Sequence, residues 1–298
     1  QDLINQGKLY LDAVRITTLD EADQMADMGF LPQVRKLLRL TPATGQRLLF
    51  SATLDGDVNK LVEQFLHDPI VHSTAPVQVA VDSMSHHLFF VGDRPARNEV
   101  ALRIAARQGK TIMFMRTKHG VDRQVKKLRR AGINAYPLHG DKGQGARTRA
   151  IEGFSDGSVP VLVATDIAAR GIDVADVSLV VHIDPPAEHK AYLHRAGRTA
   201  RGGAAGTVVT LVMDEQRKEV SALINKAGVT ATEHDISSRD NPAGAPVLKE
   251  VTGARKPNGP ALPPPGQATP QNQAKPAKKK SPSQRRRPGS RNTRRRGR

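Results

Sequence analysis

The chain has 298 residues, a formal net charge of +17 at pH 7 and no cysteine, which excludes a disulfide framework and a thiolate metal site. Its hydrophobic content of 38% is enough for a globular core. No apolar stretch approaches the roughly 20 residues of a membrane span, and no secretory pattern opens the chain. These features predict a soluble cytoplasmic protein with no membrane partner.

The first block of the chain alternates β-branched runs with amphipathic segments. Residues 13–19 predict a strand that ends at Asp20, and a helix opened by Pro32 follows. Residues 47–50 predict a second strand, which runs directly into Ser51. Apolar side chains at helical spacing then predict a further helix; they are Val58, Leu61, Val62 and Phe65. We assign residues 1–72 to the C-terminal part of a first α/β domain.

The second block is a complete α/β pattern at 86–228, after a linker at 73–85 that has no clean period. Strands are predicted at 87–91, 111–115, 134–137, 161–164, 179–183 and 207–212. Helices are predicted at 97–107, 121–131, 144–154, 189–196 and 215–227. Strands that alternate with helices favour a doubly wound parallel sheet with helices on both faces.

Residues 229–298 are assigned as a disordered basic tail. From Val251 onward the chain has fourteen Lys and Arg and no Asp or Glu, which leaves about +3 of the +17 for the first 250 residues. The tail is rich in Pro, Gly, Ser and Gln, so it buries too little apolar surface to offset its ordering entropy. Its cations predict polyanion binding, and the alternative is a solvated tail that only aids solubility.

Four motifs directly follow predicted strands. They are DEAD at 20–23, SAT at 51–53, the pair at 139–140 and ATDIAARGID at 164–173. Ligands of parallel sheets bind beyond the carboxyl ends of the strands. Two domains that face one another across the linker are therefore expected to enclose a ligand between their motif-bearing edges.

Carboxylates and arginines predict the chemistry of this cleft. Asp20, at a strand end, is placed to hold Mg²⁺ on nucleotide phosphates, and Glu21 to orient an attacking water. The alternative is that Asp20 and Asp23 only cap the next helix. Arg195, Arg198 and Arg201 recur every three residues and are expected to converge on anionic oxygens, whereas the alternative is a solvated basic helix.

Six segments resemble motifs of bacterial DEAD-box ATP-dependent RNA helicases, and the resemblance extends from residue 1 to about 228. They are DEAD at 20–23, SAT at 51–53, TIMFMRTK at 111–118, LHGDKGQGAR at 138–147, ATDIAARGID at 164–173 and YLHRAGRTARGG at 192–203. The resemblance implies two RecA-like doubly wound domains, the first truncated at its N-terminus, that bind ATP, Mg²⁺ and RNA and unwind short RNA duplexes. The resemblance does not identify any protein partner.

The resemblance also implies roles for matched positions. The residues implied to act in catalysis are Asp20, Glu21, Arg198 and Arg201, with Asp20 also holding the metal. Those implied to bind nucleotide are Asp20, Asp23, Gly171, Asp173, His194, Arg198 and Arg201. Those implied to contact RNA are Arg116, Thr117, Gly140 and Thr165. Ser51, Ala52 and Thr53 are implied to couple the nucleotide state to RNA.

One departure from the family pattern bears on activity. No G-x-x-x-x-G-K-[ST] phosphate loop occurs in the chain, and the family places this loop and the Q motif before DEAD. The chain is therefore expected to be a helicase fragment that is inactive alone. The alternative function is a non-catalytic RNA-binding module made of the second domain and the tail.

Overall fold

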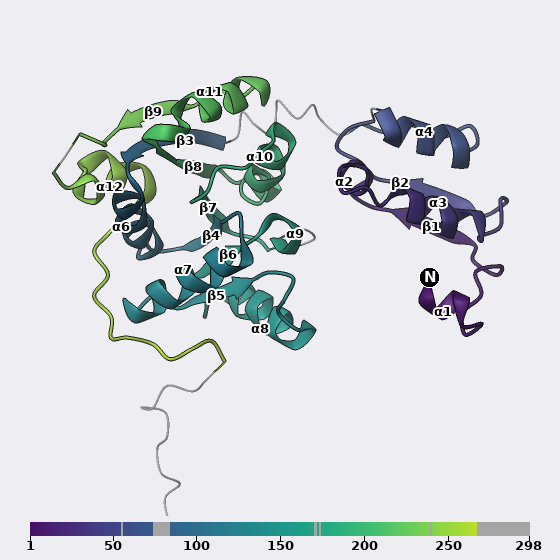
Figure 1. Ribbon diagram of the computed structural model, residues 1–298, viewed down its shortest axis with the longest axis horizontal. Helices are drawn as coiled ribbons and strands as arrows, with labels where there is room; N and C mark the ends of the chain where they lie inside the picture. Colours follow the sequence, from purple (N-terminus) through teal and green to yellow (C-terminus); the bar gives the residue numbers. More distant parts are fainter. Residues whose placement is uncertain (55, 74–83, 170–171, 173, 239, 267–298) are drawn as a thin grey trace, which may run out of the picture. The chain divides into compact units, whose positions relative to one another are not determined.

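The computed structural model describes residues 1–54, 56–73, 84–169, 172, 174–238 and 240–266, and the chain divides into two compact units, 1–74 and 75–298 (Figure 1). Each unit has its own parallel sheet. In both units the strands alternate with helices along the chain, as the hydrophobic periodicity predicts, so the RecA-like α/β fold class is confirmed.

The first unit has a two-stranded sheet. Its elements are α1 (Asp2–Asn5), β1 (Ile16–Leu19), α2 (Ala22–Asp27), α3 (Leu31–Arg39), β2 (Gln46–Leu49) and α4 (Gly56–Phe65). β1 pairs with β2 in parallel, and Leu19 lies opposite Leu49. Leu31, Leu38 and Leu61 form its buried apolar cluster, and Ala22 and Val58 are also buried. Eleven of the twelve large apolar side chains exposed among the described residues belong to this unit, so much of its apolar surface is uncovered.

The second unit has a seven-stranded parallel sheet of order β5-β6-β4-β7-β8-β3-β9. Its strands are β3 (Met84–Gly92), β4 (Lys110–Phe114), β5 (Ala135–Leu138), β6 (Val161–Ala164), β7 (Val177–His182), β8 (Gly206–Met213) and β9 (Thr232–Asp235). Its helices are α6 (Arg94–Ala105), α7 (Lys118–Arg130), α8 (Gln144–Ser155), α9 (Asp166–Ala169), α10 (His189–Ala196), α11 (Arg217–Lys226) and α12 (Pro246–Thr252), with short 3-10 turns η1 (Arg201–Gly203), η2 (Asp214–Gln216) and η3 (Pro242–Gly244).

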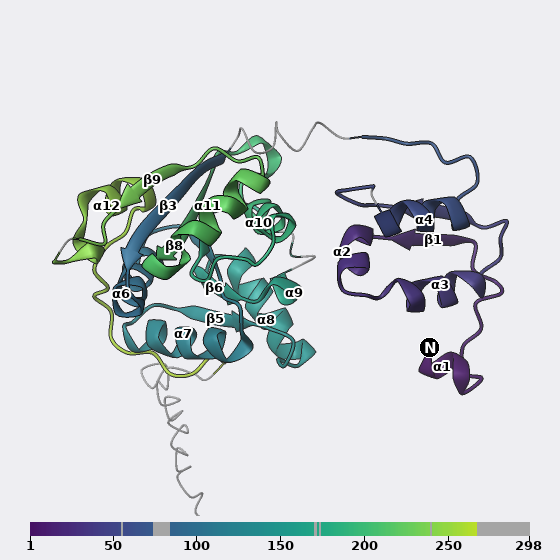
Figure 2. The same ribbon diagram turned by 45° about the horizontal axis from the view of Figure 1, so that its top comes forward.

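Helices cover both faces of this sheet. The motif-bearing loops lie at the carboxyl ends of its strands. One core cluster joins the strands to α6, α7 and α12, and the other joins them to α8, α9, α10 and α11 (Figure 2). Because consecutive strand residues point to opposite faces, Phe89 lies in the first cluster and Leu88 and Phe90 in the second. Each strand and helix predicted between 86 and 228 has a counterpart here; β6 and α10 have the predicted bounds, and the other elements are shifted by a few residues.

The structure corrects the assignment of a disordered tail from residue 229. Residues 229–266 contain β9, which pairs with β3, and α12, which packs on α6. Ile236 and Leu248 are fully buried in the core. A few apolar residues suffice here because the open edge of β3 supplies partners for the backbone of β9. Residues 267–298 lie outside the described residues, as does most of the predicted linker; Met84 and Ser85 of that linker belong to β3.

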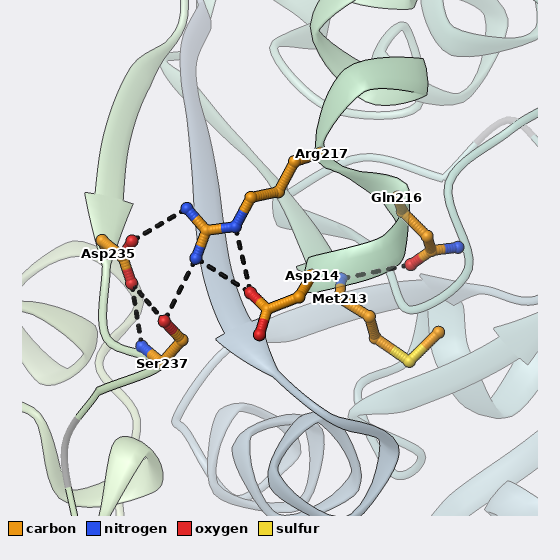
Figure 3. Close-up of polar contacts among 6 residues, drawn as sticks. All are labelled: Met213, Asp214, Gln216, Arg217, Asp235 and Ser237. Atoms are coloured by element: carbon orange, nitrogen blue, oxygen red, sulfur yellow. Dashed lines mark hydrogen bonds and ion pairs between the residues drawn. The ribbon is translucent and has the colours of Figure 1, made fainter.

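Arg217 fastens α11 to β9 (Figure 3). Its guanidinium donates to Asp235 Oδ2 at 2.8 Å, to Asp214 Oδ1 at 3.0 Å and to Ser237 Oγ at 3.1 Å, and it lies over the ring of Phe90. Hydrogen bonds from Arg217 and Ser237 lower the pKa of Asp235 to about 2. The polar cluster is half exposed, so it fixes the position of β9 more than it adds stability.

Residues 253–266, which we term the C-terminal strap, leave α12 and run along α6 and α7 (Figure 2). The strap is bonded to the domain at several points: Leu262 N–H donates to Arg129 O at 2.8 Å, and Gly266 N–H donates to the Tyr136 hydroxyl at 3.3 Å. A Cβ at Gly132, whose φ is +82°, would lie 2.4 Å from the carbonyl carbon of Gly259. The strap therefore ends beside strand β5.

Candidate functional site

DEAD and SAT lie at the ends of adjacent strands and are bonded to one another. The N–H of Asp23 donates to the Ser51 hydroxyl at 3.1 Å, and that hydroxyl donates to Thr53 O at 2.6 Å. The N–H of Ala22 also donates to the carbonyl of Phe50 at 3.1 Å. The sequence placed the two motifs at one sheet edge, and the structure adds a direct main-chain to side-chain link between them.

Asp20 and Glu21 differ in exposure and backbone conformation. Asp20 is exposed, and its Oδ1 accepts from the Glu21 N–H at 2.9 Å. Glu21 adopts a left-handed conformation with φ of 53°, which is uncommon for a residue other than glycine and turns the chain sharply from β1 into α2. Asp23 is buried, and the N-cap of α2 is Glu21, whose side chain makes no capping hydrogen bond.

The donor set at Asp20 fits magnesium bound through nucleotide phosphates. Mg²⁺ takes oxygen ligands and commonly uses only one or two protein carboxylates, keeping waters and phosphates as its other ligands. Asp20 offers one exposed carboxylate of this type. Within the described ranges no group of three or more His, Cys, Asp or Glu side chains is placed to hold a metal ion.

The four residues expected to contact RNA lie at the carboxyl ends of three neighbouring strands. Arg116 and Thr117 follow β4, Gly140 follows β5, and Thr165 follows β6. Arg116, Thr117 and Gly140 are exposed, whereas Thr165 is half-buried. Thr117 is the N-cap of α7 and accepts from the Gly120 N–H at 3.1 Å. The structure thus brings all four to one edge of the second sheet.

A basic pocket of about 270 Å³ adjoins Arg116 and Thr117. Its lining includes Arg94, Arg123 and Lys127, from the first turn of α6 and from α7. Arg97 also reaches this pocket, but it is paired with Asp184 at 2.7 Å, and the same carboxylate accepts from the Arg116 N–H at 3.0 Å. Cations gathered at this edge suit contacts to phosphate oxygens.

Arg195 does not join Arg198 and Arg201, which corrects the expectation that the three converge. Arg195 is 3% exposed and grips Asp166 with two hydrogen bonds of 2.5 and 2.9 Å. Its guanidinium also donates to the carbonyl of Asp184 and lies over the ring of Phe114. A buried, bidentate pair of this kind holds α10 against the loop after β6, so Arg195 has a structural role.

Arg198 and Arg201 are brought together at the loop after α9. Each donates from Nη1 to the carbonyl of Ile172 at 3.1 Å, and both are half-buried. His194 is half-buried one turn before Arg198. Gly171 and Asp173, expected beside the nucleotide, lie outside the described residues. The expectation of a solvated basic helix is wrong for this segment, because its arginines bond to main-chain carbonyls.

Sequence reasoning missed the acidic partners that organise this edge. Asp166 holds Arg195, and Asp184 holds Arg97 and the Arg116 amide. Their positions in the sequence could have indicated both residues, since each closely follows the end of a predicted strand. A Gly-Lys-Thr triplet at 109–111 lies at the opposite end of β4, where Lys110 donates to Ser155 O and Ala175 O, so it belongs to no phosphate loop.

Parallel sheets with helices on their faces and with motif loops at the strand ends define a chain built from RecA-like α/β units. Residues 1–61 match the DEAD/DEAH box helicase family, and residues 96–203 match the helicase conserved C-terminal domain. The chain belongs to the DEAD-box RNA helicase family.

Individual relatives agree with this assignment. The chain is 37% identical over 231 residues to the ATP-dependent RNA helicase RhlB of Pseudomonas syringae, covering 76% of this chain and 58% of the relative. It is 36% identical to the ATP-dependent RNA helicase DBP2 of Ajellomyces capsulatus, covering 75% of this chain and 42% of that one. The chain therefore spans about half the length of these curated relatives.

Among solved structures, S. cerevisiae Dbp5 bound to RNA and ADP BeF3 is similar, with a TM-score of 0.72, 29% identity and coverage of 84% of this chain and 66% of that one. The Dbp5 C-terminal domain gives a TM-score of 0.51 over 57% of this chain and 99% of that one. In the part of the chain that the structure describes, no helix is both long and apolar enough to cross a membrane.

Proposed function

We propose that this chain carries the DEAD, SAT and arginine-finger parts of an RNA helicase that couples ATP hydrolysis to local unwinding of RNA. The hydrogen bond between the Asp23 N–H and the Ser51 hydroxyl carries this proposal. Asp23 is in the first turn of α2, within the motif expected at the nucleotide, and Ser51 is in the loop expected to report the nucleotide state. A displacement of either segment would therefore be transmitted to the other.

The residues divide the chemistry between the two units. Asp20 would hold Mg²⁺, which supplies charge neutralisation at the phosphates when it is bound, and Glu21 would orient the attacking water. Arg198 and Arg201 would donate to the γ-phosphate oxygens as charge develops there. Arg116, Thr117, Gly140 and Thr165 would contact the RNA sugar and phosphate groups.

RNA-stimulated ATP hydrolysis tests this proposal in a chimaera, made by joining the part of a DEAD-box relative that precedes DEAD ahead of residue 1. We expect hydrolysis that depends on RNA and displacement of a short RNA strand. Ser51→Ala removes the acceptor for the Asp23 N–H, so it should uncouple the two activities: ATP turnover persists while strand displacement falls at least tenfold. Displacement that stays in proportion to turnover would contradict the coupling role.

A second candidate function is RNA binding without turnover. The observation that favours it is that no G-x-x-x-x-G-K-[ST] sequence occurs in the chain, so no loop of this type is present to cradle the β- and γ-phosphates. We expect the 298-residue chain by itself to bind RNA and to show no RNA-stimulated ATP turnover. Steady turnover that Glu21→Gln abolishes would exclude this candidate.

A further inference from the structure

The second unit has a pocket at the free side of edge strand β5, lined in part by Lys142 and Ala146 of the 138–147 segment. Its volume is about 560 Å³. α7 and α8 pack on opposite faces of the sheet, and residues of both helices line the pocket together with Leu262 and Gly266 at the end of the C-terminal strap. We term it the β5-edge pocket.

The rim of the β5-edge pocket carries cations without partners. Lys126 and Arg130 of α7 and Arg149 of α8 are exposed and line it. None of the three makes an ion pair or a side-chain hydrogen bond with any residue that the structure describes. The pocket is therefore positively charged, and it would attract an anionic ligand without first breaking internal salt bridges.

The one acidic side chain of the pocket is already neutralised. Asp122 Oδ1 lies 2.8 Å from Lys142 Nζ, and its Oδ2 lies 3.1 Å from His139 Nε2. Partial burial opposes ionisation of Asp122, but its interactions with Lys142 and His139 together outweigh that effect and lower its pKa. Asp122 therefore stays ionised and paired at neutral pH, and it leaves the positive rim uncompensated.

The floor of the pocket is flat and apolar. Tyr136 and Pro137 of β5 lie there beside Leu262 and the prolines of the strap. The buried Arg129 supports the floor: its guanidinium lies over the Tyr136 ring at 5.5 Å and bonds to Asn134 and to Pro263 O. The Tyr136 ring offers a planar surface on which a base can stack, and the proline rings beside it add apolar contact.

A ligand that satisfies both features must carry regularly spaced anions and flat apolar faces. Single-stranded RNA has both, since phosphates can meet the rim while a base stacks on the floor. A volume of about 560 Å³ lies within the range of small-molecule sites and suits one or two nucleotides. An acidic peptide would meet the rim but would leave the planar floor unused.

Continuity with other basic parts of the chain supports the same ligand. On α7, Arg123 and Lys127 line the pocket beside Arg116, while Lys126 and Arg130 line the β5-edge pocket, so one helix joins the two. The strap ends at Gly266, beside Tyr136, and the sequence beyond it has twelve Lys and Arg and no acidic residue.

We infer that the β5-edge pocket is an accessory subsite for single-stranded RNA, in which phosphates contact Lys126, Arg130 and Arg149 and a base stacks on Tyr136. The inference rests on the proposed RNA binding of the chain. It adds a binding point on the side of the second unit, reached along α7 from the loop that holds Arg116.

Binding of a fluorescein-labelled twelve-nucleotide oligo(U) to the full chain tests the inference. We compare Lys126→Glu/Arg130→Glu/Arg149→Glu with a control of the same charge change, Lys218→Glu/Lys226→Glu/Lys249→Glu, whose exposed lysines lie on α11 and α12. The pocket variant should bind at least tenfold more weakly than the control. Its dependence of log affinity on log salt should flatten by about 2, since each lost contact to a single strand removes about 0.7. Equal losses in both variants would overturn the inference.

Two further measurements separate stacking from charge and RNA from other occupants. Tyr136→Ala should weaken oligo(U) binding about tenfold without changing the salt slope, because the lost contact is not ionic, whereas Tyr136→Phe should keep the affinity.

Photocrosslinking of 4-thiouridine RNA to the unmodified chain should label the region 126–149 and needs no variant to fold. Absence of crosslinks there, or equal displacement of RNA by polyglutamate of matched charge, would point to another occupant and refute the subsite.

The outcomes also separate this inference from the proposed function. If the unmodified chain binds no RNA, the proposed RNA binding fails. If it binds RNA but the pocket variant matches its control, only the accessory subsite fails.

Discussion

Arg198 and Arg201 share one acceptor: each donates from Nη1 to the carbonyl oxygen of Ile172 at 3.1 Å. The shared bond holds the two guanidinium groups side by side. A γ-phosphate that engages both must replace a neutral carbonyl with a charged oxygen, a stronger acceptor. The pair is therefore held near one another before any nucleotide binds.

Replacing either arginine tests whether the pair acts on the transferring phosphoryl group. In the chimaera described above, Arg198→Ala and Arg201→Ala should each reduce kcat about a thousandfold and change ATP affinity little, because the contact strengthens in the transition state. Arg→Lys at either position should restore little, since lysine lacks the planar donor fork. Steady-state kinetics measures both effects. Near-normal kcat in both Ala variants would refute the assignment.

Arg195→Ala provides a contrast with these two residues. Arg195 is buried and paired with Asp166, so removing it leaves a carboxylate without its partner. We expect it to lower the free energy of unfolding of the second unit by about 2 kcal/mol, because charge-assisted hydrogen bonds are lost while Asp166, which is 33% exposed, can still be solvated. Urea unfolding measures this change. A fully stable Arg195→Ala variant with lost turnover would instead indicate a catalytic role.

Amide hydrogen exchange should differ sharply between the two units. The first unit has two four-residue strands and a buried apolar cluster of three residues, whereas the second has seven strands with a core on both faces. Local opening is easier where few apolar contacts must break. We expect β1 and β2 to exchange at least a hundredfold faster than β4 and β6. Similar rates in these four strands would contradict this expectation.

Stability of the second unit should fall in mild acid because of His86. Burial lowers its pKa from 6.5 to about 4, and its Nδ1 lies 2.8 Å from the Tyr192 hydroxyl. Between pH 6.5 and 4 the unfolded chain binds a proton at this histidine that the folded chain excludes. The free energy of unfolding therefore falls as the pH drops, by on the order of 3 kcal/mol across that range.

Urea unfolding at pH 7 and at pH 4.5 measures this effect. His86→Gln should flatten the pH dependence, since glutamine does not titrate. His119→Gln is the matched control, because His119 is exposed, and it should leave the dependence unchanged. If the free energy of unfolding of His86→Gln kept the same pH dependence, His86 would not be the cause of the effect.

Truncation should separate the contribution of the strap to stability from the contribution of the following sequence to RNA binding. A chain that ends at Gly266 should keep its stability but bind RNA more weakly and with a flatter salt dependence. A chain that ends at Thr252 should also lose stability, since it lacks the bonds from Leu262 to Arg129 and from Arg255 to Arg103. Thermal unfolding and RNA titration of both chains measure these effects. Equal stability of the two would show that the strap contributes nothing.

Sequence patterns predicted the second domain well because its strands are strongly apolar and regularly spaced. β6, expected at 161–164, has those bounds in the structure. The patterns failed after residue 228, where β9 has only polar and charged side chains in the sequence Thr-Glu-His-Asp. Such a strand forms because β3 offers an edge and Arg217 holds Asp235, and neither fact has a local signature.

The candidate site was also predicted only in part from the sequence. Motif order placed Asp20 and Ser51 at adjacent strand ends, and their loops are joined through Asp23 as a consequence of parallel pairing. Spacing alone could not distinguish Arg195 from Arg198, because the distinction depends on Asp166, 29 residues earlier in the chain. The catalytic and binding roles of these residues stay predictions.

Strand β9 also bears on self-association of the domain. β3 is nine residues long, with mostly buried apolar side chains, and β9 covers its segment from His87 to Phe90. A long uncovered strand of this kind is a template for pairing with another molecule. A domain cut at residue 228 would lose β9 and present that edge to solvent. Such a domain would therefore be prone to aggregate through β3. The residues after 228 prevent this by covering the β3 edge.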